Sequence, residues 1–247
     1  MSRRHLLLAG LALVALWQGA AMLVRQPVLP PPTEVGVALW EEIWNGSLGG
    51  HFLASLWRVV ASTLLAIFTA APVGLILGQS RRLNAFFAPV IYLLYPIPKV
   101  VFVPVVLLFL GIGDLSKIVV IFLILFFQIL VLVRDQAAGL RPELILSVRS
   151  LGAGRLALFR FVYLPASLPA ILTALRQSIG TAVAVLYVAE LFATQKGLGY
   201  YIYLNGSALL NYPAMYAGVV AMSVLGLGLY FLVDGMEKRW CHWQTAA

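Results

Sequence analysis

The sequence has 247 residues, of which 62% are hydrophobic and 11% are charged. Soluble domains carry about a quarter charged residues, so this composition excludes a soluble globular protein and indicates an integral membrane protein. The net charge of +8 is compatible with nucleic acid, but the basic residues are scattered at the ends of apolar stretches, which is typical of membrane topology. The single cysteine, Cys241, and three dispersed histidines predict neither a disulfide framework nor a metal site.

The first apolar stretch, residues 6–24, follows Arg3 and Arg4. It is longer than the core of a usual signal peptide and long enough to cross a bilayer. We therefore expect a retained first span that starts in the cytoplasm. Small residues at positions 19–21 leave a cleaved signal peptide as the alternative.

Residues 26–50 are more polar and begin with a proline-rich run. They predict an extended exit from the membrane, followed by a short amphipathic helix that Thr33 caps. Trp40 and Trp44 favour a position for this helix at the outer membrane surface, because an indole ring is stable where it is half solvated.

The second span is expected at residues 53–78, and Arg81 and Arg82 place its end in the cytoplasm. The third span, residues 86–111, contains four prolines that each remove a helical hydrogen bond, namely Pro89, Pro96, Pro98 and Pro104. Backbone groups freed at membrane depth survive only against protein or a water-lined cavity. A broken helix at this point therefore indicates a substrate route.

Lys99 lies in this broken stretch. An ammonium group at membrane depth is costly unless it is paired or hydrated. Two interpretations stay open. The cation faces a route for an anion, or it reaches the interface or pairs with an acid.

The fourth, fifth and sixth spans are expected at residues 118–133, 168–192 and 213–233, with an outer or re-entrant segment at 200–212. In this topology eleven of the 17 basic residues lie on cytoplasmic segments and three lie on outer segments. Because basic residues favour the cytoplasmic side, both termini are expected in the cytoplasm.

Residues 134–165, called the elbow below, are the main polar segment between the later spans. Apolar residues recur at helical spacing on both sides of Gly152 and Gly154, which predicts two short amphipathic helices joined by a tight turn and closed by Pro165. The first stripe is Leu144, Val148 and Leu151, and the second is Leu156, Phe159 and Tyr163. We interpret the elbow as a cytoplasmic docking site for a partner. A plain connector, or a segment lying on the lipid headgroups, is the alternative.

The sequence contains no Gly-x4-Gly-Lys-Ser/Thr loop and none of the common hydrolase motifs. We therefore expect neither an ATPase site nor enzyme activity in this chain. Glu190 is the one acid expected deep in the membrane, which gives little support to an ion-coupled secondary transporter. That transporter remains the alternative class of function.

The elbow resembles the Glu-Ala-Ala loop in the membrane subunits of binding-protein-dependent ABC importers. The residues that match are Arg149, Ser150, Leu151, Gly152, Ala153, Arg155, Phe159, Leu164 and Pro165. The sequence departs from the family at the triplet itself, which reads Leu146-Ser147-Val148. The resemblance therefore does not imply a contact through the family glutamate.

Further matches extend over nearly the whole chain and are similar to the branch that imports sulfonates, taurine and nitrate. They lie at residues 29–32, 51, 55–58, 96–98, 104, 111–114, 189–190 and 197–200. Some members of this branch are associated with thiamine-precursor pyrimidines. The solute therefore stays open between a small anion and such a pyrimidine.

The resemblance implies an all-α membrane protein of about six transmembrane helices with the type I ABC importer transmembrane fold. Residues 1–50 would form an N-terminal span and outer segment, and residues 51–247 the core, with its cytoplasmic coupling loop at 134–165. The implied assembly is a homodimer in a bacterial cytoplasmic (inner) membrane, with two ABC ATPase subunits that hold ATP and Mg and a periplasmic or extracellular solute-binding protein. No nucleic acid and no cofactor bound by this chain are expected.

Two sets of candidate residues follow, and neither is catalytic or metal-binding. The residues assigned to ATPase coupling are Ser147, Arg149, Ser150, Leu151, Gly152, Ala153, Arg155, Phe159, Leu164 and Pro165. The residues assigned to the substrate pathway are Pro96, Pro98, Lys99 and Glu190.

Overall fold

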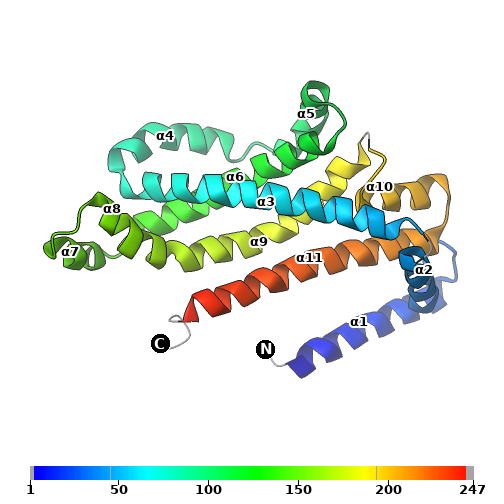
Figure 1. The fold of residues 1–247 in the computed structure, drawn as a ribbon. Coiled ribbons are helices and arrows are strands. Elements are labelled where there is room, and N and C mark those ends of the chain that lie inside the picture. Colours follow the sequence, from blue (N-terminus) through cyan, green and yellow to red (C-terminus); the bar gives the residue numbers. More distant parts are fainter. Residues whose placement is uncertain (1–2, 45, 193, 243–247) are drawn as a thin grey trace. The chain divides into compact units, whose positions relative to one another are not determined.

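The computed structural model describes residues 3–44, 46–192 and 194–242, and this part of the chain is built from helices without strands (Figure 1). In chain order the elements are α1 (Arg3–Val24), α2 (Pro32–Trp44), α3 (Leu48–Gln79), α4 (Arg81–Leu94), η1 (Lys99–Phe102), α5 (Val103–Leu110), α6 (Asp114–Ala138), α7 (Pro142–Ser150), α8 (Arg155–Leu158), η2 (Phe159–Tyr163), α9 (Leu164–Leu191), α10 (Leu198–Tyr203), η3 (Leu204–Ala208) and α11 (Tyr212–Trp240).

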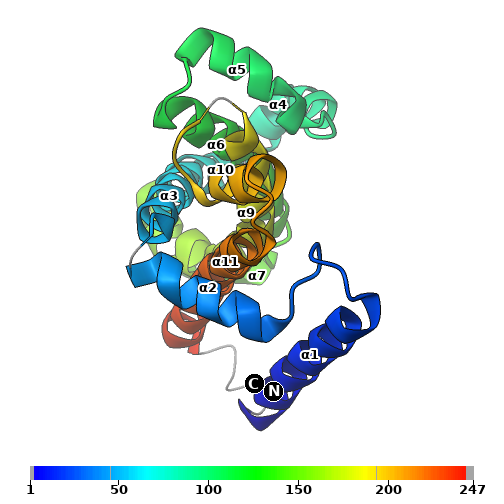
Figure 2. The same cartoon turned by 90° about the vertical axis from the view of Figure 1, so that its right-hand side faces the viewer.

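The apolar helices confirm the expected number of membrane spans. Among the described residues, 5 helical segments are long and apolar enough to cross a membrane, and they lie in α1, α3, α6, α8–α9 and α11. A sixth span arises if α4 and the η1–α5 segment count as one crossing, which is bent by 74° between them. Figures 1 and 2 both show α5 turning away from the line of α4. The broken third span predicted from its prolines is therefore confirmed.

The chain forms two compact units. Unit 1 comprises residues 1–55 and 190–225, and unit 2 comprises residues 56–189 and 226–247. Three long helices, α3, α9 and α11, contribute residues to both units. The domain boundary that the sequence suggests at residue 50 stays a prediction. The two units are defined by how residues pack in space, so they do not test that boundary.

In unit 2, α3 and α6 approach each other closely because α3 carries glycines at the contact. A Cβ atom at Gly78 would lie 2.6 Å from both the Arg134 carbonyl oxygen and the Ala137 Cβ. One turn earlier, a Cβ at Gly74 would lie 3.0 Å from the Val133 Cβ. Small residues spaced by one helical turn allow backbones in a membrane to pack tightly, and here they fix the end of α6 that leads into the elbow.

Two details of the helix ends differ from expectation. Asp114 begins α6, four residues before the fourth span expected at residues 118–133, because an acidic side chain in the first turn is favoured by the helix dipole. The expectation that Thr33 caps α2 is wrong. The helix begins at Pro32, whose fixed φ angle suits the first helical position.

In unit 1, α2 runs at a steep angle to α1 (Figure 2). The indole nitrogen of Trp17 on α1 donates a hydrogen bond to the Pro30 carbonyl at 3.1 Å, and its ring lies 5.7 Å from that of Tyr216 on α11. On α2 the exposed rings of Trp40 and Trp44 lie 5.5 Å apart, as an interfacial helix would present them.

Candidate transport pathway and coupling elbow

The elbow is folded as two helical segments joined by a glycine turn, which confirms the main sequence prediction for this region. The helix α7 ends at Ser150, and the chain turns at Gly152 with a φ of +84°. A Cβ atom at Gly152 would meet nothing within 4 Å, so the glycine is required by backbone conformation and not by crowding. The chain resumes as α8 at Arg155, whose side chain lies outside the described part of the structure.

The turn of the elbow exposes large apolar side chains among charged ones. Leu151 is 85% exposed and Leu156 is 80% exposed, on opposite sides of Gly152. Leu146, at the position of the family glutamate, and Phe161 are also mostly exposed. An apolar patch of this kind needs a covering partner, whether lipid or protein.

The apolar stripe predicted for the second half of the elbow, at Leu156, Phe159 and Tyr163, is not the buried face of this segment. Phe159–Tyr163 forms a π-helix, which advances more residues per turn than an α-helix. Within it Val162 is buried and Phe159 and Tyr163 are only half-buried, whereas Leu156, which precedes the π-helix, points outward. A helical wheel with constant spacing cannot anticipate such a change of pitch.

The prediction that Pro165 closes the elbow is also wrong. The helix α9 begins at Leu164, directly after the π-helix, so the helical backbone continues through Pro165. The ring is tolerated because it occupies the second residue of α9, where a missing N–H costs little after the wider turn. The elbow is therefore joined to α9 without a loop.

The other coupling candidates lie together on the same short stretch. Ser147, Arg149 and Ser150 are on α7, and Leu151, Gly152 and Ala153 form the turn. The Ser147 hydroxyl donates to the Leu144 carbonyl at 3.1 Å, and the Ser150 hydroxyl donates to the Ser147 carbonyl at 2.8 Å. These serines satisfy the end of their own helix, which leaves the leucine and arginine side chains to face outward.

The break in the third span is stabilised by Lys99. Its ammonium group donates to the carbonyl oxygens of Leu94 at 2.8 Å, Tyr95 at 2.9 Å and Ile97 at 3.2 Å. In a continuous helix the Leu94 carbonyl would accept from residue 98, but Pro98 has no N–H to donate. The lysine side chain therefore replaces a backbone donor that the prolines remove.

Glu190 lies in a buried hydrogen-bonded cluster in unit 1, called the Glu190 cluster below, with His51, Ser55 and residues 197–199. The Ser55 hydroxyl lies 2.8 Å and 2.9 Å from the two Glu190 carboxylate oxygens, and the Gly199 N–H donates to the same carboxylate at 2.8 Å. In turn the Leu198 N–H donates to the Ser55 hydroxyl at 2.7 Å.

A glycine and a histidine complete the Glu190 cluster. The Gly197 N–H donates to Nδ1 of His51 at 3.0 Å. Gly197 has a φ of +126°, and a Cβ at this position would lie 2.3 Å from the Glu190 carboxyl carbon. The cluster fastens the start of α10 to α3, and a pathway role for Glu190 remains a prediction beside this hydrogen bonding.

Two of the residues that resemble the family, Arg58 and Asp114, form an ion pair in unit 2. The Arg58 guanidinium, which is almost wholly buried, binds the Asp114 carboxylate with N–O distances of 2.9 Å and 2.6 Å. Three residues further along α6, the buried Lys117 ammonium donates to the Ile112 carbonyl at 2.6 Å. The ion pair joins α3 to the start of α6, and the lysine bond holds the turn before α6, where Gly111 has a φ of +73°.

The Arg176 cluster joins α9 to α11 within unit 2. The Arg176 guanidinium lies 2.8 Å from the Asp234 carboxylate and 3.1 Å from that of Glu237. The Thr173 hydroxyl also donates to Glu237 at 2.9 Å. Sequence reasoning left Arg176 without a role, because its partners lie almost sixty residues away in the chain.

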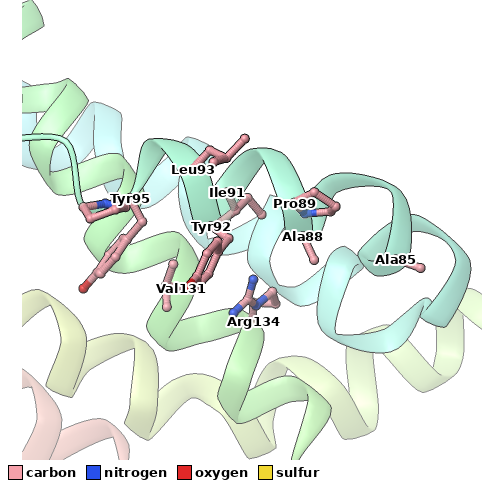
Figure 3. A pocket seen from close by; sticks show the side chains of 10 residues that line it. Ala85, Ala88, Pro89, Ile91, Tyr92, Leu93, Tyr95, Val131 and Arg134 are labelled. Atoms are coloured by element: carbon pink, nitrogen blue, oxygen red, sulfur yellow. The ribbon is translucent and has the colours of Figure 1, made fainter.

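A hollow of about 820 Å³ in unit 2 lies between α4 and α6. Figure 3 shows Arg134 rising from α6 toward the face of α4 that carries Ala88 and Tyr92. Arg134 also binds its neighbour Asp135, with an N–O distance of 2.7 Å. The remaining walls are mainly apolar, which suits contact with lipid or with another membrane helix.

Residues 62–241 match a family described as the binding-protein-dependent transport system inner membrane component. The chain belongs to this family. The match includes the break in the third span, the elbow and the Arg176 cluster, so this permease keeps its main structural features inside the family region.

Named relatives agree with this assignment. The permease is 30% identical over 233 residues to the taurine transport system permease protein TauC of Escherichia coli strain K12, which covers 92% of this chain and 84% of that protein. It is 29% identical over 242 residues to the putative aliphatic sulfonates transport permease protein SsuC of Bacillus subtilis strain 168, which covers 97% of this chain and 88% of that protein.

A solved structure supports the fold. A chain of the methionine ABC transporter MetNI in an inward-facing conformation superposes on this chain with a TM-score of 0.68 and 21% sequence identity. The alignment covers 76% of this chain and 93% of the MetNI chain. The likeness concerns the fold alone. The all-α transmembrane fold of an ABC importer permease, predicted from the sequence, is therefore confirmed.

Proposed function

We propose that this permease forms the membrane pathway of an ATP-driven importer for a small organic anion, and that a separate ATPase binds the elbow. The observation that carries this proposal is the exposed apolar turn around Gly152, which leads into a span without an intervening loop. A surface connector would gain nothing from presenting leucines of this size to water.

Coupling would operate through the stiffness of the helical backbone. The ATPase subunit would grip Leu151 and Leu156 on either side of the turn, with Arg149 and the other coupling residues around them. Because α8, the π-helix and α9 are continuous, a displacement of the turn is transmitted to α9. Transport then follows from alternate opening of the pathway on the two sides of the membrane.

The departure from the family pattern at Leu146 changes the chemistry of docking. Leu146 is mostly exposed and carries no charge, so the ATPase pocket facing it would be apolar. The positive charge of the elbow would meet acidic residues of the ATPase or the headgroups of the inner leaflet.

The assembly would contain two copies of this permease, two ATPase subunits that bind ATP and Mg, and a solute-binding protein outside the membrane. With Arg81 and Arg82 and the elbow on the cytoplasmic side, both termini are cytoplasmic. The pathway would pass the break at Pro96, Pro98 and Lys99, and Glu190 would hold α10 within unit 1. This chain would bind no nucleotide itself.

The class of solute is inferred from the relatives. TauC and SsuC are named for taurine and for aliphatic sulfonates, and both solute types carry a sulfonate group. In this permease, the Lys99 ammonium group at the helix break has the charge that a sulfonate would need in its binding site. We therefore favour a small sulfonate over a pyrimidine.

The test is reconstitution of the permease with its ATPase and binding protein in proteoliposomes. We expect uptake of radiolabelled taurine or ethanesulfonate that requires ATP. Leu151→Glu should abolish uptake and weaken co-purification of the ATPase, because it places a charge in the docking surface. The matched control is Val28→Glu, another exposed apolar residue outside the elbow, which should transport normally.

Two results would contradict the proposal. One is normal ATP-driven uptake by Leu151→Glu with the ATPase still bound. The other is uptake driven by an ion gradient when the permease is reconstituted alone, which would establish the secondary-transporter class instead.

A further inference from the structure

A smaller hollow beside the helix break combines a cation with apolar and aromatic walls. Its volume is about 310 Å³, at the lower end of the range of roughly 300–1,000 Å³ for small-molecule sites. The break, α6 and α9 all contribute to it, and its lining residues are Tyr95, Ile97, Pro98, Lys99, Val100, Ile124, Phe127, Gln128 and Val185. All of them belong to unit 2.

The charge of Lys99 in this hollow is not neutralised by an acid. Its three N–H groups meet three carbonyl oxygens, which carry partial charge only. No carboxylate within the described residues forms an ion pair with it. The ammonium also lies 4.6 Å from the centre of the Phe127 ring, whose face attracts a cation without cancelling its charge. A full positive charge therefore remains at the wall of the hollow.

The three hydrogen bonds that the Lys99 ammonium donates differ in length. The bond to the Ile97 carbonyl, at 3.2 Å, is the longest of the three and is the one that an incoming anion would replace. The bonds to Leu94 and Tyr95, at 2.8 Å and 2.9 Å, would continue to hold the break. A bond from the ammonium to an anionic oxygen, in which both partners are charged, is stronger than the bond to a neutral carbonyl that it displaces.

The remaining walls define the rest of the ligand. Phe127, Ile124 and Val185 provide an apolar surface for a short carbon chain, and Gln128 and Tyr95 provide polar side-chain groups. We propose that this hollow binds a small organic monoanion, with its sulfonate group on Lys99 and its carbon chain against Phe127. This proposal rests on the proposed function and names the site at which the pathway would bind its solute.

An alternative role for Lys99 is to cap the broken helix and nothing more. The two roles differ in their need for charge, because glutamine keeps hydrogen-bond donors without the positive charge. Arginine keeps both the donors and the charge. The pair Lys99→Gln and Lys99→Arg therefore separates anion binding from capping.

The experiment uses the full permease in lipid nanodiscs and follows the 19F NMR signal of 2,2,2-trifluoroethanesulfonate. We expect saturable line broadening for the natural protein and for Lys99→Arg. Lys99→Gln should lose affinity by about tenfold or more, as expected for a hydrogen bond to a charged group. Lys196→Gln, which removes an exposed cation elsewhere, is the control and should bind normally. A neutral probe of similar size, methyl 2,2,2-trifluoroethyl sulfone, should not compete.

The proposal is overturned if Lys99→Gln, folded as judged by its thermal unfolding, binds the sulfonate as well as the natural protein. Equal binding of the neutral sulfone would overturn it as well. Because the assay needs no ATPase, its result is independent of coupling. Loss of ATP-driven uptake in a protein that still binds the probe would refute the proposed function and leave this site intact.

Discussion

The Glu190 cluster makes a strong prediction for the substitution Gly197→Ala. An added Cβ would lie 2.3 Å from the Glu190 carboxyl carbon, which is far inside van der Waals contact. The φ angle of +126° is also unfavourable for any residue with a side chain. Alanine therefore cannot be accepted unless the Glu190 side chain or the backbone of residues 197–199 moves.

The expected cost can be worked from these contacts. Gly197 has a ψ of 156° with its positive φ, a backbone region almost restricted to glycine, and strain there contributes about 1–3 kcal/mol. Displacing the carboxylate weakens its bonds from Ser55 and Gly199 in a buried site, and each hydrogen bond to a charged group is worth about 1.5–3 kcal/mol. Together these contributions predict a loss of roughly 4–9 kcal/mol in the free energy of unfolding, comparable to the whole stability of many domains.

The measurement is unfolding of the purified permease in mixed micelles by titration with SDS, followed by circular dichroism and tryptophan fluorescence. The matched control is Gly36→Ala on α2, where a Cβ would meet nothing within 4 Å. This control should be neutral or stabilising by up to about 1 kcal/mol, because alanine favours a helix. A loss of less than about 1 kcal/mol for Gly197→Ala would refute the reasoning, since the cluster would then be able to relax without cost.

Two further substitutions test the helix contact and the elbow. Gly78→Ala places a Cβ 2.6 Å from the Arg134 carbonyl oxygen and should destabilise the permease by about 1–3 kcal/mol in the same unfolding assay, whereas Gly180→Ala, with open space around it, should not. Equal stability of these two variants would disprove close packing of α3 on α6. Gly152→Ala strains a φ of +84° at the exposed turn by about 1–2 kcal/mol and should reduce ATP-driven uptake several-fold while the spans unfold as before. Gly154→Ala is its control, and equal uptake by the two would show that the shape of the turn is unimportant.

The sequence predicted the features that depend on local chemistry. The broken third span followed from Pro96 and Pro98, because each proline removes a backbone donor wherever it falls in a helix. The turn of the elbow followed from Gly152 for a similar reason, since glycine adopts a left-handed conformation readily. Neither feature requires knowledge of distant residues.

The features that were missed depend on pitch and on long-range pairing. The π-helix at Phe159–Tyr163 changes the helical spacing without a residue type that announces it. Arg176 finds Asp234, and Arg58 finds Asp114, only after the helices pack. Resemblance to a family marked several of these residues, including Arg58 and Asp114, but their common location became evident from the structure.

The Arg176 cluster has a practical consequence for anyone who shortens the protein for expression. A truncation that ends before Asp234 would remove both acids that face Arg176 and leave its guanidinium without these counter-charges on a mainly apolar span. Inserting such a cation into lipid is unfavourable, so the shortened chain should be degraded or mis-inserted even though its hydrophobic segments are nearly complete. The last two turns of α11 are thus needed for biogenesis, and purification tags belong beyond them.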